Sequence, residues 1–227
     1  GNATSGLGIE RGEVERSVYD ILVDGQDVEG TRQREVHFPY LDVVPSTRDL
    51  VGAEVELVNE PERELVLRRA LLAVKDQYDY ILVDCPPSLG LLTLNTLAAS
   101  DSVLIPIQCE FYALEGLSQL LNTIRLVQRN LNTRLEIDGV LLTMFDQRLN
   151  LSRQVAEEAK EYFGDRVFRT VIPRNVRLAE APSFGKPIVL YDILSSGAQA
   201  YLALAREIMR RDDPSGAEAS HSAAAGS

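Results

Sequence analysis

The sequence predicts an α/β protein built on a doubly wound, mostly parallel β-sheet flanked by helices. Several short segments are apolar at consecutive positions, which is typical of parallel strands covered on both faces. Segments with apolar residues at helical spacing lie between them. With 227 residues, of which 45% are hydrophobic and 25% charged, the chain is long enough for one large core and ordinary for a globular protein.

The order of the expected elements alternates between strand and helix. Expected strands are Leu41–Val44, Tyr80–Asp84, Ser102–Ile107, Ile137–Thr143, Val167–Ile172 and Ile188–Leu190. Expected helices are Glu13–Val23, Pro61–Val74, Ala113–Leu131, Leu151–Phe163 and Ala198–Met209. The helix over Pro61–Val74 has proline in its first turn, acidic residues early and arginines late, which suits the helix dipole. Residues 1–211 are expected to form one domain, and the small, polar residues 212–227 a disordered tail.

Composition narrows the function classes. No stretch approaches the roughly 20 apolar residues of a membrane span, and no N-terminal apolar segment resembles a signal peptide. The two cysteines, Cys85 and Cys109, fit free thiols in a reducing cytoplasm. The net charge of −11 argues against a uniformly basic DNA-coating surface, but it leaves room for a local basic patch.

One short stretch, "YDYILVDCPPSLG", ends an apolar run on the carboxylate of Asp84. Ligands of open parallel sheets lie beyond the carboxyl ends of the strands. Pro86 and Pro87 keep the chain from turning at once into a helix. An apolar strand that ends in Asp is the pattern of a Walker B element, whose carboxylate holds Mg²⁺ beside a nucleotide. The alternative for Asp84 is an ordinary turn-capping residue.

Three longer stretches resemble the ParA/Soj family of chromosome-partitioning ATPases. They are "YILVDCPPSLGLLTLNTLAASDSVLIPIQCEFYALEGLSQLLNTIRLVQ", "GVLLTMFDQRLNL" and "TVIPRNVRLAEAPSFGKPI", and the resemblance covers nearly all of residues 1–210. It implies a P-loop ATPase with a deviant Walker A motif that dimerises around two ATP molecules with Mg²⁺. It further implies DNA binding without sequence preference, hydrolysis stimulated by a ParB-type centromere-binding protein, and a cytoplasmic, nucleoid-associated protein.

The sequence departs from this family in one respect. The pattern G-x-x-x-x-G-K-[ST] occurs nowhere, and Gly185-Lys186 is followed by Pro187. In the family, the phosphate loop precedes a segment that resembles "GNATSGLGIERGEVERSVYDIL", which here is residues 1–22. The chain is therefore expected to lack the first β–P-loop–α unit and to be inactive alone. A sequence cut short before residue 1 is the preferred explanation, and a genuinely shortened protein is the alternative.

The resemblance implies roles for individual residues. Asp84 would hold the Mg²⁺ shell through water and act in catalysis, while Pro86, Pro87 and Ser88 would shape a loop near the γ-phosphate. Asn2–Gly8 would be a switch-like loop, with a flexible surface loop as the alternative. The residues implied in nucleotide binding are Thr143, Met144, Pro173, Arg174, Asn175 and Glu110. For Met144 the alternative is core packing, and for Glu110 a charge at a helix N-terminus.

Arginines and cysteines also have two interpretations. In the family, arginines that match Arg148 and Arg177 contribute to DNA binding, which needs cations for the phosphates and no reading of bases. Ordinary solvated or ion-paired arginines are expected at Arg153, Arg166, Arg169 and Arg174. The cysteines could suggest an iron–sulfur cluster, as in the related nitrogenase iron proteins, but their flanks lack that family's glycine-rich surroundings, and inert thiols are expected.

Two other functions remain open at this point. A membrane-cycling ATPase of the septum-site type needs a C-terminal amphipathic helix with basic and bulky apolar faces. The final residues here are "DDPSGAEASHSAAAGS", which lack that pattern. The second alternative is a non-catalytic DNA-binding or dimerisation fragment, which a nucleotide-binding assay would separate from an enzyme.

Overall fold

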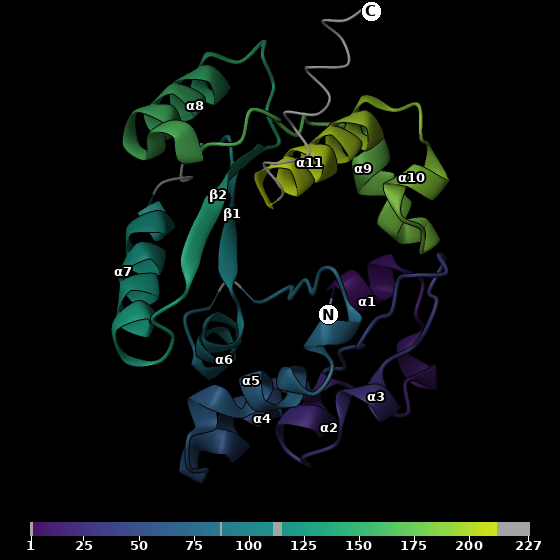
Figure 1. The fold of residues 1–227 in the computed structure, drawn as a ribbon. Coiled ribbons are helices and arrows are strands. Elements are labelled where there is room, and N and C mark those ends of the chain that lie inside the picture. The colour runs from purple at the N-terminus through teal and green to yellow at the C-terminus, as the bar shows by residue number, and fades with distance from the viewer. Residues whose placement is uncertain (1, 87, 111–114, 213–227) are drawn as a thin grey trace, which may run out of the picture. The chain divides into compact units, whose positions relative to one another are not determined.

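The computed structural model in Figure 1 describes residues 2–86, 88–110 and 115–212. Contacts between Cα atoms divide the chain into two compact units. Unit 1 contains residues 1–103, 116–137 and 181–187, and unit 2 contains residues 104–115, 138–180 and 188–227. The expected tail from 213 onward lies outside the described residues, and Asp212 is the last residue of a helix. The single domain over 1–211 stays a prediction.

Unit 1 is mostly helical. Its helices are α1 Asn2–Gly6, α2 Val18–Leu22, α3 Val28–Thr31, α4 Leu50–Glu56, α5 Val66–Leu72, α6 Leu91–Ala99 and α7 Glu115–Asn130. Ser17 starts α2 with a capping box: its backbone N–H donates to Asp20 Oδ2 at 2.7 Å, and its hydroxyl accepts from the Tyr19 N–H at 3.2 Å. Leu22 then joins Ala53, Leu57 and Leu67 in a core that unites α2, α4 and α5.

The described part of unit 2 contains most of the two strands and four helices. Its elements are β1 Ser102–Gln108, β2 Glu136–Thr143, α8 Asn150–Phe163, α9 Val176–Glu180, α10 Ile188–Tyr191 and α11 Ser196–Asp212. The two strands run parallel, because Glu136 N bonds Asp101 O at 3.0 Å at one end and Cys109 N bonds Thr143 O at 2.9 Å at the other. The expected α/β fold is confirmed.

β2 is buried at four consecutive positions, residues 139–142, as expected for a strand covered on both faces. Figure 1 shows α8 and α11 on either side of the paired strands. On one face, Leu141 packs with Phe168, Ile172 and Leu204 of α11. β1 alternates between buried and exposed residues toward its end, and its exposed Pro106 suits an edge strand.

The expected strand Val167–Ile172 runs parallel to β2 only through isolated bridges. Phe168 N bonds Val140 O and Ile172 N bonds Leu142 O, both at 2.9 Å. The register therefore slips between these two bonds. The donors Phe168 and Ile172 are four residues apart, whereas the acceptors Val140 and Leu142 are two residues apart. The N–H groups of Arg169 and Thr170 instead donate to the carboxylate of Glu207 in α11, each at 2.8 Å.

Two other expected strands are wrong. Leu41–Val44 makes only an antiparallel bridge between Val43 and Gln33 and joins no parallel sheet. Ile188–Leu190 lies in the helical turn α10, where Asp192 N bonds Ile188 O at 2.8 Å. Pro187 precedes this turn, and its fixed φ favours the start of a helix.

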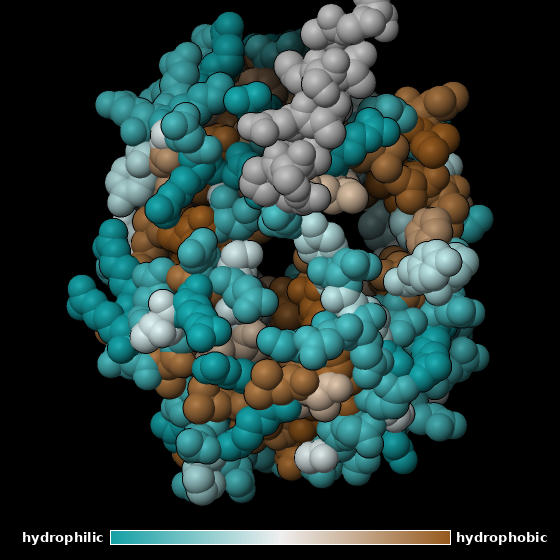
Figure 2. Space-filling view, viewed as in Figure 1, coloured by the Kyte–Doolittle hydropathy of each residue, from teal (hydrophilic) through white to brown (hydrophobic). Residues whose placement is uncertain are grey.

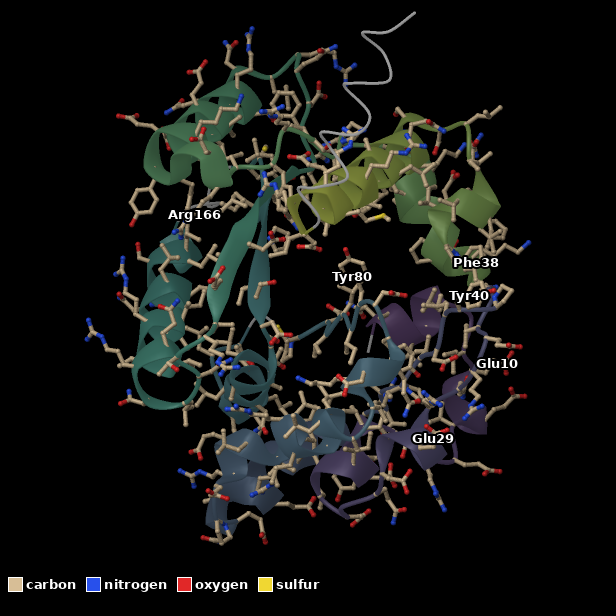
Figure 3. The ribbon with its side chains drawn as sticks, viewed as in Figure 1. Glu10, Glu29, Phe38, Tyr40, Tyr80 and Arg166 are labelled. Atoms are coloured by element: carbon tan, nitrogen blue, oxygen red, sulfur yellow. The ribbon has the colours of Figure 1, made fainter. Side chains whose placement is uncertain are left out.

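The expected strand Tyr80–Asp84 is also wrong, and it brings apolar side chains to the surface. Residues 80–86 have no regular structure, and no strand of the described chain pairs with them. Because a strand requires the backbone of a neighbouring strand, these residues form no strand. Leu82 is 92% exposed and Tyr80, labelled in Figure 3, is 48% exposed. Figure 2 shows apolar side chains at several places on the molecular surface.

The long helices were predicted best. α8 and α11 match their predicted ranges to within a few residues, and so does the described part of α7. The helix expected over Pro61–Val74 begins only at Val66, since Glu62 has a left-handed φ of 51° and Arg63–Leu65 form a 3₁₀ turn. The helix expected over Glu13–Val23 shortens to α2, and the sequence reasoning missed α4 and α6.

Candidate nucleotide and DNA site

The carboxyl end of the sheet in unit 2 holds most of the expected nucleotide-binding residues. Thr143 ends β2, and its hydroxyl donates to Ile107 O of β1 at 3.2 Å. Cys109 N bonds Thr143 O, and Cys109 O accepts from the Ser152 hydroxyl of α8 at 3.1 Å. The ends of both strands and the start of α8 are thus held together.

Met144 turns the chain out of β2. Its φ of 53° is left-handed, which is strained for a residue with a side chain. This turn lets Phe145 pair with Pro173: Phe145 N bonds Ile172 O at 3.1 Å, and Arg174 N bonds Phe145 O at 3.0 Å. The segments that contain Thr143–Met144 and Pro173–Asn175 therefore lie side by side, although they are distant in sequence.

Glu110 belongs to the same neighbourhood, because its carboxylate forms an ion pair with Arg174. Both side chains are about half exposed, at 51% and 49%. The alternative for Glu110, a charge at a helix N-terminus, concerns residues 111–114, which lie outside the described residues. This ion pair fits the expectation that Arg174 is not a DNA-binding arginine, and its implied role in nucleotide binding stays a prediction.

Asn175 ties two helix starts together. Its Oδ1 accepts from the backbone N–H of Arg177 at 2.8 Å and of Leu178 at 3.3 Å, which caps α9. Its Nδ2 donates to the Ser196 hydroxyl at the start of α11, at 2.8 Å. The stretch from Thr170 to Pro187 contains α9 and the 3₁₀ turn Ala181–Phe184.

Arg148 is the more exposed of the two expected DNA-binding arginines, with 83% of its side chain in solvent. Its Nε donates to Asp146 Oδ1 at 2.9 Å and its Nη2 donates to Asp146 Oδ2 at 2.7 Å. Its backbone N–H also donates to Asp146 Oδ1, at 3.0 Å. These bonds lower the pKa of Asp146 to about 2. The remaining guanidinium N–H groups can still reach a phosphate.

Arg177, in α9, is 54% exposed and meets two carboxylates. It lies 2.9 Å from Glu180 and 3.5 Å from Asp192. The Tyr191 hydroxyl donates to Glu180 as well, at 3.0 Å, and the pKa of Glu180 is lowered, first by Arg177 and then by Tyr191. Arg177 is thus half-accessible but partly neutralised in this conformation.

Asp84 lies in unit 1, in the irregular segment described above. Its carboxylate is exposed, which suits a Mg²⁺ shell completed by water and phosphate oxygens, because Mg²⁺ often takes only one or two carboxylates. Among the described residues, no three His, Cys, Asp or Glu side chains gather to form an all-protein metal site. Ser88 O accepts from the Thr93 hydroxyl, which fixes one end of the predicted loop, while Pro87 lies outside the described residues.

The segment Asn2–Gly8 was expected as a loop, and it contains helix α1 instead. Gly8 and Gly185 have φ values of 75° and 60° and pack against each other. A Cβ on Gly8 would lie 2.7 Å from Gly185 O. The His37 ring Nε2 lies 2.8 Å from Leu7 O and 3.1 Å from Gly185 O. This contact of three segments was missed, since a lone histidine gives no such signal.

The two cysteines are free thiols, Cys85 exposed and Cys109 buried. Burial raises the pKa of Cys109 to about 11, so that this thiol stays protonated at neutral pH. Although Cys85 is exposed at the surface, neighbouring atoms partly desolvate its thiol, and its pKa is raised first by this desolvation and then by the charge of Asp84. Both shifts agree with the expected inert thiols.

Comparisons with known proteins place the chain in a family. A family described as an AAA domain matches residues 1–137. The sporulation initiation inhibitor protein Soj of Bacillus subtilis is 65% identical over 208 residues, which cover 92% of this chain and 82% of that protein. The chromosome partitioning protein ParA of Myxococcus xanthus is 58% identical over 214 residues, covering 94% of this chain and 75% of that protein.

Solved structures share the fold. Cobyrinic acid a,c-diamide synthase from Mycobacterium smegmatis, with a bound ATP analog and magnesium, is 33% identical with a TM-score of 0.80. That match covers 92% of this chain and 78% of the other. The cell division ATPase MinD of Pyrococcus furiosus has a TM-score of 0.73 at 24% identity, over 92% of this chain and 81% of its own, and supports the fold alone. The chain belongs to the ParA/Soj family of chromosome-partitioning ATPases.

Proposed function

We propose that this protein acts in chromosome or plasmid partitioning as a nucleotide-controlled DNA binder. ATP and Mg²⁺ close two copies into a dimer, the dimer holds DNA without sequence preference, and hydrolysis stimulated by a ParB-type partner releases it. The observation that carries the proposal is the pairing of Phe145 with Pro173 in unit 2. It gathers the expected nucleotide-binding residues at the end of β2, in the same unit as Arg148 and Arg177.

The base of the nucleotide would lie against the face of Pro173. Thr143 and Met144 would flank it, since the left-handed turn at Met144 puts both beside Pro173. Arg174 and Asn175 would read the polar edge of the base. The side-chain amide of Asn175 already bonds the start of α9 and the Ser196 hydroxyl. We therefore assign the contact with the base to the backbone carbonyl of Asn175. Glu110 would hold Arg174 in place.

Asp84 would hold Mg²⁺ through water. When bound, the ion supplies positive charge that neutralises the phosphate oxygens. The 227 residues contain no phosphate-loop motif, whose backbone N–H groups and lysine would stabilise the transferred phosphoryl group. We therefore propose that these residues alone bind the base side of a nucleotide weakly and do not hydrolyse ATP.

DNA binding would rest on Arg148 and Arg177. The net charge of −11 repels DNA at long range, so binding needs a concentrated cationic patch. One patch holds few cations, and a dimer doubles the number of phosphates contacted. DNA binding would therefore depend on the nucleotide, because ATP drives dimerisation. Such a protein would work in the cytoplasm, on the nucleoid.

The test compares this chain with the same chain extended at its N-terminus by a segment that carries G-K-G-G-V-G-K-T. We expect Mg²⁺-dependent ATP hydrolysis from the extended chain alone, and its loss in the extended Asp84→Ala variant. Asp84 is exposed, so its replacement opens no core cavity, and circular dichroism should show an unchanged fold. Robust hydrolysis by residues 1–227, or normal hydrolysis by the Asp84→Ala variant, contradicts these assignments.

No described helix is both long and apolar enough to span a bilayer. Nothing specific favours a membrane-cycling function over partitioning, and flotation with liposomes tests it directly. We expect the chain to stay with the soluble fraction in the presence and absence of ATP.

A further inference from the structure

Helix α4 of unit 1 carries apolar side chains on two faces, and only one of them is covered. Ala53 and Leu57 are 0% and 2% exposed and pack in the core with Leu22 and Leu67. Val51, Val55 and Val58 are 80%, 74% and 49% exposed. Their spacing of four and then three residues places them on one face of α4 and of the 3₁₀ turn Leu57–Asn59 that follows. We call them the valine stripe.

The valine stripe does not help α4 to fold. Valine is β-branched and loses side-chain freedom in a helix, so three solvent-facing valines weaken α4 compared with alanine or glutamate. Surface helices normally carry polar residues on their outer face. Apolar residues grouped on a surface and surrounded by polar ones mark interaction sites. Figures 1 and 2 show α4 in a region where apolar and hydrophilic side chains alternate on the surface.

The chain around the valine stripe is acidic. Residues 48–64 contain six carboxylates and two arginines, which leaves four negative charges. The inward carboxylate Glu54 accepts from Leu92 N at 3.3 Å, while Glu62 and Glu64 pair with Arg69 and Arg63. The three other acidic residues are exposed and have no basic partner among the described side chains: Asp49, Glu56 and Glu60.

Glu56 is also held in position. The Tyr19 hydroxyl of α2 donates to both of its carboxylate oxygens, at 2.9 and 3.0 Å. The hydroxyl leaves the negative charge in place, and each carboxylate oxygen retains a lone pair for a cationic donor. A charge that is already fixed beside an apolar face can orient an incoming basic side chain without a further loss of its own conformational entropy.

We propose that the valine stripe and its exposed carboxylates dock a basic amphipathic segment of a partner protein. Apolar side chains at positions i, i+3 or i+4, and i+7 of that segment would cover the valines, and neighbouring Lys or Arg would meet Glu56 and Glu60. A second copy of this surface would bring like charges together, and an anionic membrane would be repelled for the same reason. Residues 213–227 contain no Lys or Arg, so they do not supply the segment.

The proposal can be tested on the full 227-residue chain with a labelled helical peptide that repeats Leu at heptad spacing and has Lys elsewhere. Fluorescence anisotropy should show binding that weakens with salt, and a peptide with Glu in place of Lys should not bind. The double variant Val51→Ser/Val55→Ser should weaken binding about tenfold. The matched control, Val176→Ser in unit 2, removes a 70% exposed valine and should change binding less than about twofold.

Charge has its own matched pair of variants. Glu56→Gln/Glu60→Gln should weaken binding, whereas Glu157→Gln/Glu161→Gln removes the same charge from the exposed side of α8 and should not. Circular dichroism melting confirms that each variant folds. Equal binding by wild type and the valine variant, or equal effects of the two charge pairs, overturns the proposal. If the wild type forms a dimer that the valine variant abolishes, the valine stripe binds a second copy of the chain. If the chain binds phosphatidylserine vesicles through the stripe, the stripe binds a membrane. Either result also overturns the proposal.

Discussion

Arg148 and Asp146 form a two-pronged ion pair directly after β2, with Nε–Oδ1 at 2.9 Å and Nη2–Oδ2 at 2.7 Å. The carboxylate side chain is only 11% exposed, while the arginine is 83% exposed. Asp146 therefore fixes the arginine at its base and leaves its outer edge in solvent. An arginine held in this way loses less conformational freedom when it contacts a phosphate.

This ion pair predicts a pH dependence of stability. The pKa of Asp146 falls from 3.8 to about 2 on folding, first through its hydrogen bond to the Arg148 side chain. A lowered pKa contributes stability above the unfolded value, and this contribution is lost as pH falls through the folded value. Urea midpoints should therefore drop between about pH 4 and pH 2 in the wild type.

Asp146→Asn should flatten that acid drop and leave the slope above pH 5 unchanged. The effect is small, because the arginine is well solvated. Glu158→Gln on α8 is a suitable control, since Glu158 has no arginine partner among the described residues. The same acid profile in wild type and Asp146→Asn would refute the role of this ion pair.

The contact between Gly8 and Gly185 predicts a large difference between two glycine replacements. Gly8→Ala places a methyl group 2.7 Å from a backbone oxygen at a left-handed φ, whereas a Cβ on Gly12 meets nothing within 4 Å. Gly8→Ala should lower the free energy of unfolding by at least about 1 kcal/mol. Gly12→Ala should have little effect in the same urea titration, and comparable losses from both would contradict the packing described here.

The exposed segment Tyr80–Asp84 predicts aggregation. Leu82 is 92% exposed, and its neighbours Ile81 and Val83 are exposed as well, so an apolar segment that lies outside the sheet is open to pairing with other chains. Leu82→Lys should reduce aggregation in light-scattering measurements, because a charge blocks edge-to-edge pairing. Leu194→Lys is the matched control: it removes an 86% exposed leucine of unit 2 that follows a helical turn. Equal improvement from both variants would mean that surface hydrophobicity alone causes the aggregation.

The sequence predicted long elements better than short ones, for physical reasons. α8 and α11 repeat an apolar face over several turns, and β2 is apolar at consecutive positions, so each signal is long. Strand pairing depends on a neighbour, which explains why the equally apolar residues 80–84 form no strand. The slipped register of 167–172 arises from Glu207, a residue of a distant helix that no local pattern reveals.

The site was predicted from the family resemblance, which implied that Thr143 and Pro173 both bind the nucleotide. The pairing of Phe145 with Pro173 brings the segments that contain them side by side. The left-handed turn at Met144 and the contacts of His37 depend on tertiary packing. The roles of Thr143, Met144, Pro173 and Asp84 stay predictions.

The central claim is that Arg148 and Arg177 bind DNA and that ATP-driven dimerisation controls this binding. Each phosphate contact adds about 0.9 to the slope of log affinity against log salt. Replacing either arginine with alanine removes two contacts per dimer, and should therefore lower that slope by roughly two and weaken all DNA sequences equally. Neither side chain is assigned to the nucleotide, so dimerisation should survive. Arg153→Ala, on the exposed start of α8, is the control and should leave the slope unchanged.

The most direct measurement is the DNA affinity of the extended, phosphate-loop-bearing protein over a salt series with ATP, in parallel with its dimerisation. The account predicts a steep slope for the wild type, a loss of roughly two in slope for each single arginine variant, and unchanged dimer formation. Wild-type affinity and slope in the double variant Arg148→Ala/Arg177→Ala, or loss of the dimer together with DNA binding, would contradict it.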